Sequence, residues 1–95
     1  MKQGNKVYVY RKTYVFALKG NTLVEVPKSM SEGGLQEGKY IIVEIERESR
    51  IDPYKVTVWC YEVKSGVVSK RELETFYEKD GGAALLRAED LAHQC

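Results

Sequence analysis

Basic side chains are concentrated in the first third of this 95-residue chain, where they could bind phosphate groups. Residues 1–28 contain six Lys or Arg and one Glu, whereas acidic side chains outnumber basic ones in residues 29–95. Each cation that contacts a nucleic-acid phosphate releases a condensed counterion, which favours binding. The uneven charge therefore indicates a polyanion partner, although a solvated charged face would give the same pattern. Arg11 and Lys12 belong to this basic third.

Catalytic chemistry has little support in the residue types present. The single histidine, His93, is close to the last residue, where chains fray, and no second imidazole could share a metal or general-base role with Cys60. The glycine pairs Gly33-Gly34 and Gly81-Gly82 lack the other positions of a phosphate-binding loop. We expect a protein that is not an enzyme and that has no metal site and no cofactor.

The two cysteines, Cys60 and Cys95, are too few for a disulfide framework or a metal cluster. We expect both to be free thiols. No apolar run approaches the roughly 20 residues that cross a bilayer, and the first residues lack the apolar stretch of a secretion signal. We therefore expect a cytoplasmic protein with no membrane partner.

The elements that would position these residues are mainly strands. Apolar, β-branched and aromatic runs predict strands over residues 7–10, 14–18, 23–26, 39–46 and 54–63. Gly20-Asn21 supplies the positive-φ positions of a tight turn, which predicts a hairpin over residues 14–26. Within residues 39–46 the apolar side chains of Tyr40, Ile41, Ile42, Val43 and Ile45 are nearly continuous, so that strand should be buried on both faces.

The C-terminal third changes to a helical pattern. The spacing of Ser69 and Glu72 is that of a capping box, which predicts a helix from Lys70 to Lys79 that Gly81-Gly82 ends. A second helix is expected over residues 83–93, and one helical turn at most over residues 29–32. The predicted fold is a single α+β domain (residues 1–95), mainly antiparallel β, as a small barrel with one or two helices in a C-terminal helical region (67–93).

One central segment resembles a known family. "KGNTLVEVPKSM" followed by "GLQEGKYIIVEIE", residues 19–46, is similar to the AbrB/MazE-type swapped-hairpin DNA-binding domain. The resemblance covers about a third of the chain and rests on an ordered set of motifs: Gly20-Asn21-Thr22, Val26-Pro27-Lys28, Gly34-Leu35 and Gly38. It implies a homodimer in which residues 14–46 of two chains share one barrel. It also implies DNA-facing positions at Lys19, Asn21 and Lys28.

These observations lead to one main hypothesis, a small dimeric DNA-binding transcription regulator or antitoxin-like protein. The predicted contacts to the phosphate backbone are Arg11, Lys12, Lys19, Asn21 and Lys28. The C-terminal helices would brace the dimer or hold a second protein. The alternative is an OB- or SH3-like barrel that binds single-stranded nucleic acid, with tyrosines stacking on bases, or a protein partner. A structural or inhibitory protein without a nucleic-acid partner is a third possibility.

Overall fold

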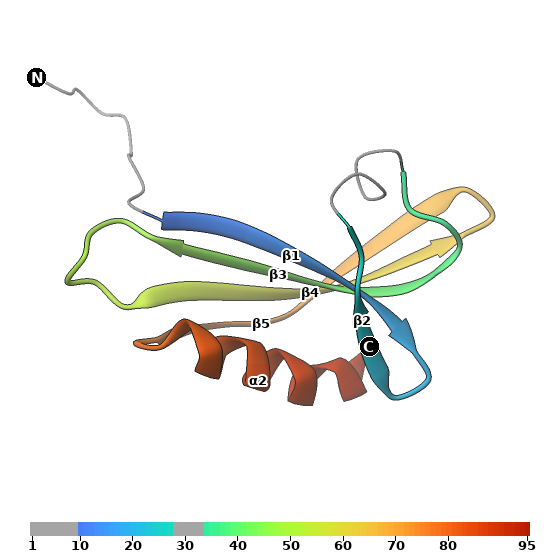
Figure 1. Ribbon diagram of the computed structural model, residues 1–95. Helices are drawn as coiled ribbons and strands as arrows, with labels where there is room; N and C mark the ends of the chain where they lie inside the picture. The colour runs from blue at the N-terminus through green and yellow to red at the C-terminus, as the bar shows by residue number, and fades with distance from the viewer. Residues whose placement is uncertain (1–9, 28–33) are drawn as a thin grey trace, which may run out of the picture.

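The computed structural model describes residues 10–27 and 34–95, which form one sheet and a C-terminal helix (Figure 1). The strands are β1 (Tyr10–Lys19), β2 (Thr22–Glu25), β3 (Gly38–Arg47), β4 (Tyr54–Lys64) and β5 (Val67–Glu78), and they are followed by helix α2 (Gly81–Leu91) and the 3-10 helix η1 (Ala92–Gln94). All neighbouring strands are antiparallel, in the order β2-β1-β3-β4-β5. This confirms the mainly antiparallel α+β prediction, but the sheet is open and does not close into the predicted barrel.

Two tight turns set the register of the two hairpins. Lys19 pairs with Thr22 across the turn Gly20-Asn21, and Gly20 has a left-handed φ of 63°. The predicted β1–β2 hairpin is therefore confirmed. At the β4–β5 turn, Ser65 and Gly66 have φ values of 54° and 78°, as a two-residue hairpin turn of the I′ type requires. The strand predicted over residues 7–10 and the helical turn predicted over 29–32 fall largely or wholly outside the described residues.

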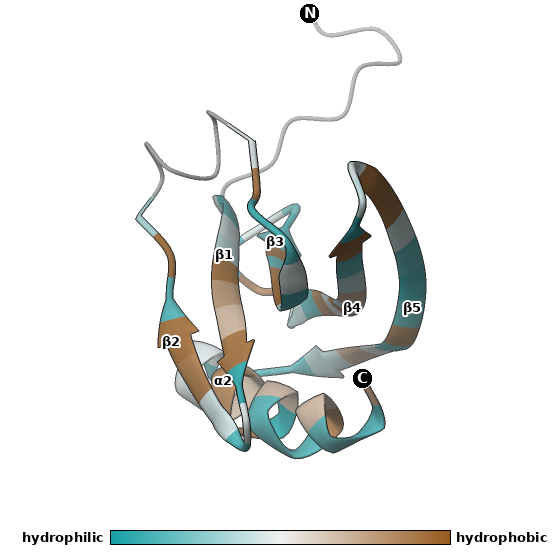
Figure 2. Cartoon of the chain, turned by 90° about the vertical axis from the view of Figure 1, so that its right-hand side faces the viewer, coloured by the Kyte–Doolittle hydropathy of each residue, from teal (hydrophilic) through white to brown (hydrophobic). Residues whose placement is uncertain are grey.

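The central strand β3 separates two faces of the sheet. Its side chains alternate, so that Ile41 and Val43 point toward α2 while Ile42 points to the opposite side, and all three are buried. The prediction that this strand is buried on both faces is confirmed. Figure 2 shows that the sheet is strongly curved and that α2 crosses beneath one face, which we call the helix-covered face. The opposite face is called the uncovered face.

The helix predicted from Lys70 to Lys79 is wrong, because residues 70–78 belong to β5, which pairs with β4 along its whole length. A β-bulge explains the misleading pattern. Glu74 pairs with Val58 and Glu72 with Trp59, which leaves Leu73 without a partner in the ladder. Leu73 and Phe76 then both pack on the helix-covered core, at the three-residue spacing of a helix.

The helix predicted over residues 83–93 is present, as α2 followed by η1. Gly81-Gly82 begins α2 rather than ending an earlier helix. The Asp80 side chain caps the N-terminus by accepting a hydrogen bond from the Gly82 amide at 3.0 Å. The C-terminal helical region is therefore shorter than predicted and consists of residues 81–94.

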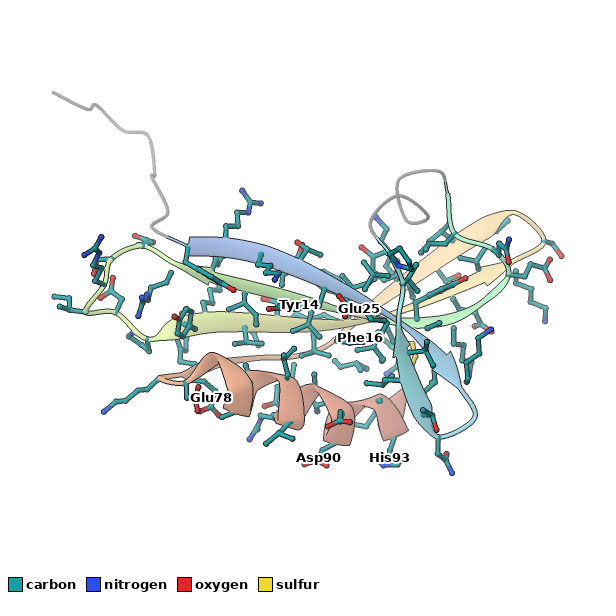
Figure 3. All side chains as sticks on the ribbon, in the orientation of Figure 1. Tyr14, Phe16, Glu25, Glu78, Asp90 and His93 are labelled. Atoms are coloured by element: carbon teal, nitrogen blue, oxygen red, sulfur yellow. A yellow bond between two sulfur atoms is a disulfide. The ribbon has the colours of Figure 1, made fainter. Side chains whose placement is uncertain are left out.

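The expectation of two free thiols is also wrong. Cys60 of β4 and Cys95, which follows η1, form a disulfide (yellow in Figure 3). The two residues are 35 positions apart, but β5 runs away from Cys60 and α2 runs back along the sheet. The return of the chain places Cys95 beside β4, so the disulfide fastens the end of the helix to the sheet.

Candidate functional site

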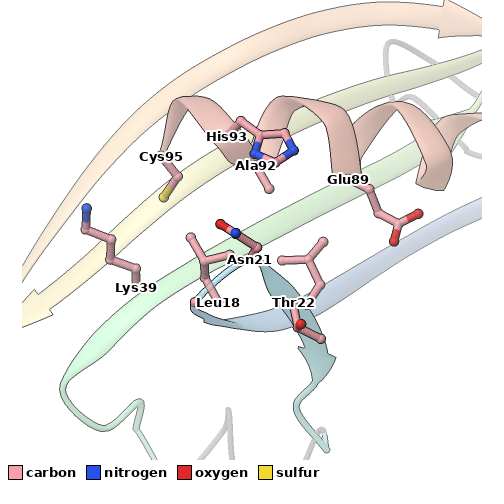
Figure 4. Close-up of a pocket in the computed structure, with 10 residues that line it drawn as sticks. Leu18, Asn21, Thr22, Lys39, Glu89, Ala92, His93 and Cys95 are labelled. Carbon is pink, nitrogen blue, oxygen red and sulfur yellow. The ribbon is translucent and has the colours of Figure 1, made fainter.

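A cleft of about 590 Å³ lies between the tip of the β1–β2 hairpin and the C-terminal end of α2 (Figure 4). Its polar lining side chains are Asn21, Thr22, Lys39, Glu89 and His93. The volume is in the range of small-ligand sites, and the lining combines donors with one carboxylate. The cleft can therefore accept a polar ligand group.

Three elements that are distant in the chain position this lining. The β1–β2 turn carries Asn21, and Lys39 lies opposite Leu18 near the start of β3. His93 comes from η1, which the disulfide of Cys95 holds against β4. The strand register therefore places Asn21 and Lys39 at the cleft, and the disulfide places His93 there.

A second hollow of about 390 Å³ adjoins this cleft, because Lys39 and Cys95 line both. Its charged lining residues are Lys39, Glu62, Lys70 and Arg71, and we call it the basic recess. Cross-strand pairing builds it: Lys39 lies opposite Glu62, and Arg71 lies opposite Cys60. Three cations against one carboxylate give the recess a net positive lining.

The cations of the basic recess differ in their contacts. Arg71 donates from Nη2 to the carbonyl of Gln94 at 2.7 Å, and it thereby neutralises part of the negative end of the C-terminal helical segment. The Lys70 ammonium lies 5.3 Å from the centre of the Tyr61 ring. Within the described part of the chain, the Lys39 ammonium has no hydrogen-bond or ion-pair partner. Lys39 is therefore the cation best placed to bind a ligand.

The predicted DNA contacts Arg11 and Lys12 lie at the far end of β1, on opposite faces of the sheet. Arg11 is paired with Glu46 at a distance of 3.9 Å between Nε and Oε2. The Lys12 ammonium is 4.7 Å from the centre of the Tyr14 ring, and its pKa is raised, chiefly by hydrogen bonding with the Tyr14 side chain. These two residues therefore do not share one surface.

The remaining predicted contacts are also separated. Lys19 lines a different hollow, of about 450 Å³, together with Val24 and Tyr40. Asn21 lines the cleft in Figure 4, and Lys28 falls outside the described residues. Of the four predicted contacts in the described ranges, the structure brings only Asn21 beside the basic recess.

Sequence reasoning missed Lys39, Lys70, Arg71 and His93. Lys39 and Arg71 are 32 positions apart and meet only through the register of three strands. Lys70 and Arg71 lie between Ser69 and Glu72, whose spacing matches a capping box, so the sequence predicts a helix there and not a strand. His93 lies near the end of the chain, but the disulfide two residues later holds this segment in place.

Neither a metal centre nor a membrane helix is found in the part of the chain that the structure describes. No group of three or more His, Cys, Asp or Glu residues there could hold a metal ion. No described helix is long and apolar enough to span a bilayer.

Comparison with known proteins gives no match: no family model fits the chain, and no curated protein or solved structure is significantly similar to it. The resemblance to the AbrB/MazE-type domain therefore stays a prediction. The same holds for DNA binding, for the homodimer, for a protein partner on the C-terminal helix and for the cytoplasmic location.

Proposed function

We propose that the protein binds the phosphate backbone of DNA in the basic recess at the end of α2. The observation that carries the proposal is the net positive lining by Lys39, Lys70 and Arg71 against Glu62 alone. The hollow at the far end of the sheet has the opposite balance, with three carboxylates and two cations: Glu46, Glu48, Asp52, Arg47 and Lys55. A polyanion would therefore be drawn to the recess end of the molecule.

The three cations would have different tasks. Lys39 and Lys70 would act as point charges on neighbouring phosphates. The Arg71 guanidinium has five N–H donors, so its bond to Gln94 leaves others for a phosphate oxygen. Asn21 and Thr22 in the adjoining cleft add neutral donors for phosphate or sugar oxygens. Contacts of this kind fix the position of the duplex without reading bases, so sequence selectivity should be modest.

The test is a salt titration of duplex binding by fluorescence anisotropy, with matched double variants. Lys39→Ala/Lys70→Ala removes two cations from the recess. Arg50→Ala/Lys55→Ala makes the same charge change at exposed positions in the β3–β4 connection and at the start of β4, at the end of the sheet opposite the recess. The recess variant should lower the slope of log affinity against log salt by about 1.8, since each phosphate contact contributes roughly 0.9. The control should keep the slope of the unmodified protein.

Equal slopes for the two double variants would contradict the proposal, as would a wild-type affinity that does not change with salt. Both variants should first give the circular dichroism spectrum of the unmodified protein. This comparison separates a loss of phosphate contacts from a loss of folding.

A second candidate function is single-strand binding on the uncovered face. It is favoured by the Lys70 ammonium above the half-buried Tyr61 ring, on the face that also carries Trp59. Bases could stack on such a platform. Because Trp59 is the only tryptophan, its fluorescence should be quenched by single-stranded oligonucleotides if they bind there. Binding in the basic recess predicts no such quenching and an affinity for duplex at least as high.

A further inference from the structure

The outer edge of β5 differs from the other edge of the sheet. β5 has 12 residues and pairs only with β4 in the described part of the chain, whereas the opposite edge strand β2 has four residues. Three of the exposed large hydrophobic side chains belong to β5: Val67, Val68 and Tyr77, with exposed fractions of 64%, 49% and 63%. A long edge strand with exposed apolar side chains is a template for pairing with another strand.

We propose that two copies of the chain pair antiparallel along this edge, β5 against β5, with the two-fold axis between Glu72 and Leu73. The two sheets would then join into one continuous sheet. This contact is isologous, since each copy contributes the same strand. It uses a different surface from the swapped hairpin that the sequence suggested. Arg71 belongs both to this edge and to the basic recess, but dimerisation is tested without DNA.

The β-bulge decides which registers are possible. In a regular strand, Val68 and Tyr77 would lie on opposite faces, because they are nine positions apart. The extra residue Leu73 brings Val68 and Tyr77 onto the same face. Val68 lies opposite Val63 and Tyr77 opposite Lys55, and both of these β4 residues belong to the uncovered face. Apart from the Glu72–Leu73 pairs at the bulges themselves, partners in an antiparallel pair must share a face. Residues on the two sides of the bulge therefore match only when they are an odd number of positions apart.

Among these registers, the one with the axis between Glu72 and Leu73 is complementary in side-chain type. It places Val68 of one copy opposite Tyr77 of the other, and Arg71 opposite Glu74. Both members of the second pair face the helix-covered side, where Arg71 bonds Gln94 and Glu74 bonds Arg87. Moving the second copy by two residues would instead place Arg71 opposite Phe76. Opposite charges across a strand pair stabilise it, and an apolar pair adds to this.

The test measures the oligomeric state by sedimentation velocity over a wide concentration range. The unmodified protein should form a concentration-dependent dimer. Val68→Glu should weaken dimerisation by at least tenfold, because it replaces the apolar contact between Val68 and Tyr77 of the second copy with a carboxylate against the Tyr77 ring at both symmetric positions. Val24→Glu is the matched control, since Val24 is 48% exposed, lies on the other edge strand and faces the uncovered side. This control should leave the dimer unchanged.

A rescue variant tests the register itself. Val68→Glu/Tyr77→Lys restores an opposite-charge pair at both symmetric positions, so dimerisation should recover relative to Val68→Glu alone. A monomer at all concentrations would overturn the proposal. Equal weakening by Val24→Glu, or no recovery in the double variant, would also overturn it. Unchanged thermal unfolding of the monomeric variants would show that the edge was altered without loss of the fold.

Discussion

On the helix-covered face the core is continuous, whereas on the uncovered face it is confined to one end of the sheet. Helix α2 brings the small side chains Ala84 and Ala88 against β3 and β4, and the largest fully buried side chains lie beneath it: Ile41, Val43, Val56 and Val58. The uncovered face buries only Tyr40, Ile42 and Val63. Half-buried Trp59 packs against this cluster and donates to the Glu44 carboxylate at 2.9 Å.

This difference assigns separate tasks to the two faces. The helix-covered face contains most of the apolar area that folding removes from water, so it should provide most of the stability. The cluster on the uncovered face holds the segment before β3, where the Tyr40 hydroxyl donates to the Gln36 carbonyl at 2.6 Å. Side chains at other positions of the uncovered face can be replaced, or can contact a ligand, without loss of buried core contacts.

Two neighbouring isoleucines give the strongest test of this comparison. Ile41→Ala should lower the free energy of unfolding by about 4 kcal/mol, and Ile42→Ala by about 2 kcal/mol, since the second site can partly collapse toward solvent. Ile41 is 0% exposed and Ile42 is 6% exposed, on opposite faces. Urea denaturation measures both values. Equal losses would show that the two faces contribute equally.

Removal of the disulfide should have the next largest effect. Cys60→Ala/Cys95→Ala should destabilise the protein by about 3–4 kcal/mol, because the closed loop spans a sequence separation of 35. A reducing agent should lower the denaturation midpoint of the unmodified protein and leave that of the double variant unchanged. If the reducing agent leaves the midpoint of the unmodified protein where it was, the disulfide contributes little to stability in solution.

A single hydroxyl tests the smaller cluster of the uncovered face. Tyr40→Phe leaves the Gln36 carbonyl without its partner and should cost about 1 kcal/mol. Hydrogen exchange should speed up in residues 34–38 and stay unchanged in α2. Faster exchange throughout α2 would mean that the two faces unfold together.

The smallest expected effect is a dependence on alkaline pH. Burial, followed by interaction with Tyr14, raises the pKa of Tyr10 above its ordinary value of 10. The folded state therefore favours the neutral phenol. Its contribution to stability is fully present below pH 10 and is lost as pH rises above 10 through the folded pKa. Thermal unfolding between pH 8 and 11 should show a slightly steeper loss for the unmodified protein than for Tyr10→Phe; parallel curves would contradict this.

The strands that could be predicted from the sequence are those whose local pattern agrees with their final environment. β3 is continuously apolar from Tyr40 to Val43, where both of its faces are buried, and β4 alternates from Val56 to Tyr61 as its two faces require. The two-residue turn at Gly20-Asn21 needs only local backbone conformation. These features do not depend on distant parts of the chain.

The features that could not be predicted depend on distant partners. The bulge at Leu73 exists only opposite β4, and without β4 the spacing of Leu73 and Phe76 matches a helix. The disulfide requires that α2 return along the sheet. The basic recess likewise combines Lys39 with Arg71 through the register of β3, β4 and β5. Position in the first third of the chain was therefore a poor guide to which cations lie together.

The bond between Cys60 and Cys95 also makes residues 60–95 a covalent ring that contains β5 and α2. A protease that cuts once inside this ring, for example at the exposed Ser65-Gly66 turn, would not release a fragment. The cut protein would migrate as one species until a thiol was added and as two species afterwards. Within an oxidising environment, the ring would keep the helix attached to a molecule whose backbone had already been severed.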